Sequence, residues 1–114
     1  MKPRFRARKR HIPGSMNKTE EAYEQRLIDS RNLGYIEDFW FEGIKLKLAA
    51  NTFFTPDFLV QASDGVLECH EVKGGFIEDD AMVKLKCAAD KYPFRFILAQ
   101  RKKAKEPFEV REIG

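Results

Sequence analysis

Apolar side chains recur along the chain with two different periods, and the period changes at recognisable breaks. In residues 18–32, Tyr23 and Leu27 are one helical turn apart among polar neighbours, which predicts an amphipathic helix. Asn17 is suited to cap this helix, and Glu20 follows three residues later as in a capping box. We therefore expect the first element to be a helix over 18–32.

The next stretch of the chain has the period of two that is typical of strands. A Ser-Asp-Gly turn at 63–65 is typical of a hairpin between two of these strands. The first two runs are either one bent strand or two short ones, because Gly43 interrupts them. The sequence predicts strands over 36–41, 44–48, 53–61 and 66–73.

Two glycines, Gly74 and Gly75, end this β-rich stretch, and a second helix is predicted over 78–91. Its expected buried face recurs at helical spacing through Ala81, Leu85, Ala88 and Tyr92. A strand over 94–100, a basic loop over 101–107 and an edge strand over 108–113 complete the chain. The order α-β-β-β-α-β with a last edge strand predicts an α/β fold, with a mixed sheet flanked by helices and a right-handed strand–helix–strand crossover.

Composition limits the chain to one domain, because 114 residues leave no room for a second core. No apolar stretch approaches the roughly 20 residues of a membrane span. The polybasic amino terminus lacks the apolar segment of a secretory signal, so we expect a cytoplasmic protein. Two cysteines, Cys69 and Cys87, make neither a disulfide framework nor a zinc site, and we expect both to be reduced core residues.

The net charge of +3 is unevenly distributed, because basic residues crowd the start of the chain and the remainder is slightly acidic. We expect residues 1–15 to form a basic arm and linker, and residues 16–114 to form the folded domain. Such an arm is typical of contacts with nucleic-acid phosphates or an anionic surface, and a solubilising tail is the alternative. The basic residues of the arm are Lys2, Arg4, Arg6, Arg8, Lys9 and Arg10.

Candidate chemistry gathers in two short segments, Pro56-Asp57 and Glu71-Val72-Lys73. Side chains alternate along a strand, so Glu71 and Lys73 are expected on one face and Val72 on the other. If the two strands pair across the 63–65 turn, Asp57 comes close to Glu71. Proline cannot donate to a sheet ladder, so Pro56 indicates a strand edge or irregularity where the sheet opens.

Two carboxylates and an ammonium on one patch suit a hard divalent cation such as Mg²⁺, with Mn²⁺ expected to substitute. The expected ligands are Asp57 and Glu71, with the main-chain carbonyl of Val72 as a further candidate. Lys73 is then placed to orient or deprotonate an attacking water, or to stabilise charge in the transition state. The pattern does not choose between these roles of Lys73.

Glu20 is the next candidate, because helical geometry puts it on the same face as Tyr23 and Leu27. An unpaired carboxylate on a packed face is costly, so Glu20 either serves only the capping box or also reaches the metal site. Glu24, one turn further on, is the fallback. Glu21 points elsewhere.

The other chemically capable side chains have weaker claims. Lys84 lies off the apolar face of the second helix, where it either contacts DNA phosphates or is an ordinary solvated lysine. His70 alternates against Glu71 and should face the other side of the sheet as a structural histidine. The sequence contains no convincing nucleophile–histidine arrangement and no glycine-rich phosphate loop.

These motifs resemble the PD-(D/E)XK nuclease superfamily, with Pro56-Asp57 as the first half and Glu71-Val72-Lys73 as the second. The resemblance is most specific to small phage and prophage proteins related to phage endonuclease I, and it is carried by residues 17–23, 53–60, 70–74 and 92–96. It implies the αβββαβ core of restriction endonucleases, with Glu20, Asp57, Glu71 and Lys73 in the active site. It also implies branched DNA of the Holliday-junction type as substrate, a homodimer, and a bacterial host cytoplasm if the protein is phage-encoded.

The sequence therefore predicts a Mg²⁺-dependent DNA endonuclease, structure-selective on branched or duplex DNA and without a membrane partner. One alternative is a restriction-type or transposase-type nuclease subunit that acts with a partner protein. Another is a non-catalytic DNA-binding module, although the retention of Asp57, Glu71 and Lys73 counts against it. A third is an RNA-binding protein that uses the basic arm.

Overall fold

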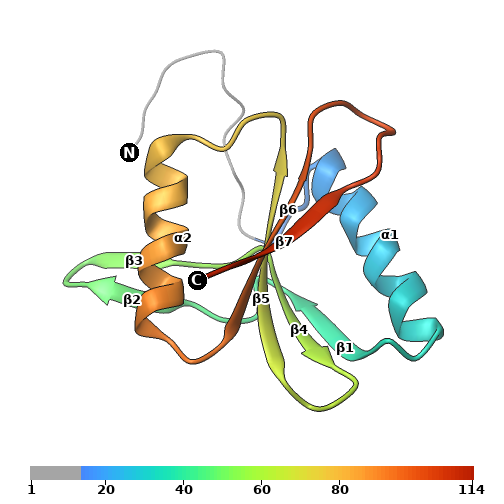
Figure 1. Ribbon diagram of the computed structural model, residues 1–114, viewed down its shortest axis with the longest axis horizontal. Coiled ribbons are helices and arrows are strands. Elements are labelled where there is room, and N and C mark those ends of the chain that lie inside the picture. Colours follow the sequence, from blue (N-terminus) through green and yellow to red (C-terminus); the bar gives the residue numbers. More distant parts are fainter. Residues whose placement is uncertain (1–13) are drawn as a thin grey trace.

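The computed structural model describes residues 14–114 as a three-layer α/β arrangement. Figure 1 shows a twisted central sheet with helix α1 on one side and helix α2, with a small hairpin, on the other. The predicted mixed sheet flanked by helices is confirmed. The basic residues predicted to contact DNA in the amino-terminal arm, Arg4, Arg6, Arg8, Lys9 and Arg10, lie outside the described residues.

Helix α1 spans Lys18–Asn32, as its apolar spacing and capping residues predict. The capping box is present: the Asn17 side chain accepts from the Glu20 backbone at 2.8 Å, and Glu20 Oε1 accepts from the Asn17 backbone at 3.0 Å. Tyr23 and Leu27 are buried against the sheet, where they pack with Phe58, Val60, Val72 and Ala99. Within residues 14–114, no helix is long and apolar enough to cross a membrane.

The main sheet contains five strands in the order β1-β4-β5-β6-β7. The strands are β1 (Ile36–Phe41), β4 (Phe58–Ala62), β5 (Leu67–Gly74), β6 (Arg95–Arg101) and β7 (Glu109–Ile113). Only β5 and β6 pair in parallel, and the other neighbours are antiparallel. The β4–β5 hairpin turns at Gly65, which has a φ of +89°, as the Ser-Asp-Gly pattern predicts.

Helix α2 (Asp79–Lys91) covers the opposite face together with a separate two-stranded sheet, β2 (Leu46–Ala49) and β3 (Thr52–Phe54). Two lysines of α2 and its C-cap residue hold the hairpin through its backbone: Lys84 donates to the Phe53 carbonyl, Lys91 to the Leu48 carbonyl and Tyr92 to the Lys47 carbonyl. A hydrophobic core on this side of the main sheet, separate from the one under α1, lies between the sheet, α2 and the hairpin. It consists of Leu46, Phe54, Cys69, Leu85, Ala88, Phe96, Leu98 and Ile113.

The prediction of one continuous strand over 53–61 is wrong. Strand β3 ends at Phe54, β4 begins at Phe58, and the two belong to different sheets. The intervening segment contains Pro56, which has no N–H for a ladder and is fully buried where the chain passes from one sheet to the other. Pro56 therefore marks a change from one sheet to another and not only the edge of a strand. Asp57 precedes β4 instead of lying on it.

The prediction that both cysteines are core residues is correct only for Cys69. Cys69 is buried in the α2-side core, whereas Cys87 is exposed. Cys87 follows the buried Leu85 by two positions on α2, and about 200° of helical rotation turns it toward solvent.

Candidate functional site

The predicted site residues meet where three elements converge: the start of β4, the end of β5 and the first turn of α1. The register pairs Phe58, the first residue of β4, with His70, so Asp57, which immediately precedes β4, comes opposite Glu71. Residues Glu20, Asp57, Glu71 and Lys73 are thus supplied by separate segments and are brought to one end of the sheet.

Asp57 and its neighbours on β5 are joined by hydrogen bonds in both directions. The Val72 N–H donates to Asp57 Oδ2 at 2.8 Å, and the Asp57 N–H donates to Glu71 Oε1 at 3.3 Å. A third bond, from the Glu42 N–H to the Asp57 carbonyl at 2.8 Å, holds the same segment from the end of β1. The backbone around Asp57 is therefore anchored to both neighbouring strands, which positions its carboxylate.

Lys73 lies on the same face of β5 as Glu71, as alternation predicts, and its Nζ is 3.5 Å from Glu71 Oε2. Val72 points the other way and is buried under α1. Glu71 is 8% exposed, whereas Lys73 is only partly covered. The ammonium group is therefore a partly solvated cation at the rim of a buried carboxylate.

Glu20 serves the capping box, as predicted, and it also lies beside Asp57, while its role at a metal stays a prediction. It is 6% exposed, and the charge of its carboxylate contributes to raising the pKa of Asp57. Glu24, the fallback, is not needed for this contact. The first turn of α1 approaches closely because Gly74 has no side chain: a Cβ there would lie 3.0 Å from Thr19 Oγ1.

Crowding of carboxylates gives the site its unusual electrostatics. Burial, the charge of Glu71 and the charge of Glu20 raise the pKa of Asp57 to about 9, although the Val72 N–H opposes the shift. Burial also raises the pKa of Glu71, against the lowering effect of Lys73. If all the carboxyl groups were ionised, they would carry more negative charge than the Lys73 ammonium balances, which is why the folded site favours their protonated forms. Perturbed pKa values of this kind are typical of functional sites.

The donor set suits a divalent cation in charge and ligand type. Hard oxygens from one or two carboxylates are enough for Mg²⁺, which keeps several of its waters in proteins. No three Asp, Glu, His or Cys side chains within 14–114 are arranged as a ready coordination group. Asp57 and Glu71 are the two carboxylates that could hold a cation, and its binding stays a prediction. Val72 contacts Asp57 through its N–H, and this bond says nothing about its carbonyl. The carbonyl of Val72 therefore stays a predicted ligand.

His70 is a structural residue on the opposite face, as predicted. It is 7% exposed, its Nδ1 is 2.7 Å from the Tyr23 hydroxyl, and its Nε2 is 2.8 Å from Glu68 Oε1. Arg95 completes the chain of bonds at 2.6 Å from Glu68 Oε2. This network ties α1 to the middle of the sheet, one residue away from Glu71.

Lys84 contacts the protein itself, since its Nζ donates to the Phe53 carbonyl at 3.3 Å. Its side chain is exposed, as expected of a solvated lysine, and the contact with DNA phosphates stays a prediction. Two further contributors to the site have no sequence signal. Glu42 acts through its backbone, at a φ of +50°, and Gln100 supports the turn after Lys73 by donating to the Gly75 carbonyl at 2.7 Å.

Comparison with known proteins adds no evidence for a family or a function. No protein-family model, curated protein or solved structure matches the chain. The resemblance to PD-(D/E)XK nucleases therefore stays a prediction.

Proposed function

We propose that the chain is a Mg²⁺-dependent DNA endonuclease that hydrolyses phosphodiester bonds, with a preference for branched DNA. The observation that carries the proposal is the close placement of the Asp57 and Glu71 carboxylates with the Lys73 ammonium at the rim. An ordinary ion pair between Glu71 and Lys73 along β5 would not require a second buried acid beside it. Ionising this second acid in its buried position costs free energy, and its pKa is raised for that reason.

The side chains divide into holding and reacting groups under this proposal. Asp57 and Glu71 would hold the cation, and Glu20 adds negative charge next to Asp57. A bound divalent cation supplies charge neutralisation on the phosphate and an activated water. Lys73 faces the same space and acts on the water or on the charge that develops on the phosphate.

Nucleic acid is the proposed substrate because the chain has basic segments that could bind its phosphates. The amino-terminal arm and the segment 101–105 are both rich in Lys and Arg. Contacts of this kind position DNA without reading its sequence, so a chain of 114 residues is better suited to recognising shape. Cutting two strands symmetrically requires two active sites, and we propose a two-fold homodimer.

Two related functions keep the same site. A nuclease subunit that needs a partner protein would have low activity alone, and a non-catalytic DNA-binding module would bind without cutting. Both predict different outcomes in one experiment.

The test compares wild type with Asp57→Asn on a labelled four-way junction and on a linear duplex of matching sequence, each in Mg²⁺ and in EDTA. We expect wild type to cut the junction only with Mg²⁺, and Asp57→Asn to bind the junction without cutting it. Cutting of both DNAs supports the nuclease and removes the preference for branches. Binding without any cutting by wild type, with Mn²⁺ as well as Mg²⁺, overturns the proposal in favour of the two related functions.

A further inference from the structure

Phe76, immediately beyond the site, exposes an aromatic ring to solvent. Its side chain is 92% exposed, more than that of any other large apolar residue of segment 14–114. It follows Lys73 by three positions, in the connection between β5 and α2. A single exposed apolar side chain is ordinary on a protein surface. A function for Phe76 therefore has to be argued from its position and from the contacts that hold its backbone.

The turn that presents Phe76 is held in place. The Gly75 N–H donates to the Arg101 carbonyl at 2.8 Å, and Gln100 Nε2 donates to the Gly75 carbonyl at 2.7 Å. Gly75 has a φ of +85°, which a glycine adopts without strain. These bonds fasten the residue before Phe76 to the end of β6, so the ring is presented from a fixed backbone.

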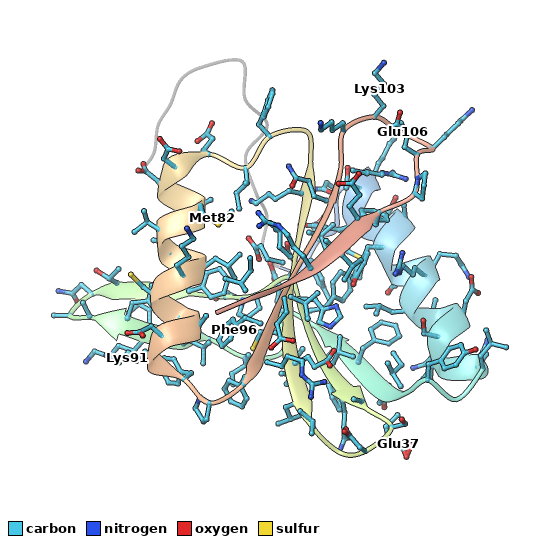
Figure 2. The ribbon with its side chains drawn as sticks, in the orientation of Figure 1. Glu37, Met82, Lys91, Phe96, Lys103 and Glu106 are labelled. Atoms are coloured by element: carbon cyan, nitrogen blue, oxygen red, sulfur yellow. The ribbon has the colours of Figure 1, made fainter. Side chains whose placement is uncertain are left out.

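A basic loop lies beside this turn. The connection from β6 to β7 follows Arg101, the last residue of β6, and contains Lys102, Lys103 and Lys105, with Glu106 as its acidic member. Figure 1 shows the connection after β5 and the β6–β7 connection at the same end of the molecule. Lys103 points away from the body of the protein (Figure 2). Cations and an exposed ring therefore occupy one end of the sheet.

Charge on the other side of Phe76 is negative, because α2 begins with Glu78, Asp79 and Asp80. Phosphates would be repelled there and attracted toward the β6–β7 loop. A nucleic-acid strand beside the site is thus directed across the end of β5 and β6. This asymmetry favours a polyanion on the loop side of the ring.

We infer that Phe76 stacks on an unpaired base of the DNA substrate while the lysines of the β6–β7 loop bind the adjacent phosphates. An aromatic platform next to a basic surface is the usual way in which proteins bind unpaired strands. In a fully paired duplex each base face is covered by its neighbours, so the ring would have to unstack them at a free-energy cost. The substrate class is therefore DNA with locally unpaired nucleotides. This inference rests on the proposed function for the cutting step only.

The test measures binding in EDTA, so that no DNA is cut. Anisotropy gives the affinities of wild type, Phe76→Ala and Phe76→Trp for three DNAs of one sequence: single-stranded, bulged and fully paired. We expect Phe76→Ala to weaken binding to the first two by about ten-fold and to the duplex by less than about two-fold. Phe76→Trp should retain binding. Neutralising Lys102 and Lys103 should weaken all three alike and reduce the salt dependence.

A spectroscopic readout separates stacking from a structural effect. The chain has one tryptophan, so Trp40→Phe combined with Phe76→Trp places a single reporter at the ring position. Unpaired DNA should quench its fluorescence and paired DNA should not. The control reporter is Leu33→Trp combined with Trp40→Phe. Leu33 is 71% exposed at the carboxyl end of α1, about 22 Å from the start of that helix, which lies next to the site.

Each outcome decides the inference. Equal losses on paired and unpaired DNA, an unchanged affinity of Phe76→Ala, or no quenching at position 76 overturns it. Selective loss with quenching supports it even if wild type cuts no DNA, which would defeat the proposed nuclease alone. Cutting by Phe76→Ala with wild-type preference among the three DNAs defeats the inference and leaves the nuclease proposal standing.

Discussion

Glu71 Oε1 lies 3.3 Å from the backbone nitrogen of Asp57, although the two residues belong to different segments on either side of a hairpin. The same Asp57 receives the Val72 N–H on its carboxylate. Backbone donors thus hold two acids together although ionising both would place like charges side by side. A fold maintains such an arrangement at a cost to stability, and that cost can be measured.

Replacing Asp57 with a residue that cannot ionise should stabilise the protein. The folded chain holds the Asp57 proton up to a pKa of about 9, whereas an ordinary aspartate releases it near 3.8. As pH rises between these values the unfolded chain loses its proton first, so the free energy of unfolding falls. We expect Asp57→Asn to be more stable than wild type by about 1–2 kcal/mol at pH 8 in EDTA. Denaturant unfolding from pH 4 to 9 measures this.

The pH profile provides the control for that prediction. Wild type should lose stability from pH 4 toward pH 9, and Asp57→Asn should lose less of it over the same range. Glu37→Gln, which changes an exposed acid near the far end of β1, should follow wild type. A wild-type profile that rises across this range would contradict the raised pKa.

Divalent cations should raise the stability of wild type, because a ligand that binds only the folded chain stabilises it by mass action. At a concentration about 100 times its dissociation constant, Mg²⁺ should contribute roughly 2.7 kcal/mol. Glu71→Gln should lose most of this gain, and Glu37→Gln should keep it. Thermal melts with and without Mg²⁺ measure the effect, and a gain that survives in Glu71→Gln would place the cation elsewhere.

Glu20→Gln should separate the two roles of Glu20. Its amide oxygen can still accept the Asn17 N–H, so the capping box is retained while the charge beside Asp57 is removed. We expect stability within about 0.5 kcal/mol of wild type and a loss of at least about ten-fold in the cutting rate. Glu24→Gln, one turn along the same helix, is the matched control. If both variants cut alike, Glu20 acts only as a cap.

Tyr23→Phe should reduce stability and leave the chemistry intact. The variant removes the hydroxyl that lies 2.7 Å from His70 Nδ1 in a buried network, and the unsatisfied nitrogen should cost about 1–3 kcal/mol. His70 faces away from Glu71, so the cutting rate per folded molecule should not change. Chemical denaturation tests the first part, with the exposed Tyr35→Phe as control. A rate loss at unchanged stability would tie His70 to the site.

Local patterns predicted much of the candidate site. Alternation on β5 was enough to put Glu71 and Lys73 on one face and Val72 on the other, and the structure has them so. The capping box between Asn17 and Glu20 was equally visible, because it joins residues three apart. Cys87 was misjudged, since its burial depends on where its helix packs and not on its residue type.

The sequence by itself determined the two helices, most of the strands, the faces of β5 and the cap of α1, because each depends on bonds and alternation among near neighbours. Only the tertiary structure decided that Pro56 carries the chain between two sheets, that Gly74 admits Thr19, and that Glu20 reaches Asp57. These relations join residues distant in the chain, and they follow from how helices and sheets pack. The raised pKa of Asp57 has the same origin, because burial and neighbouring charge exist only in the assembled fold.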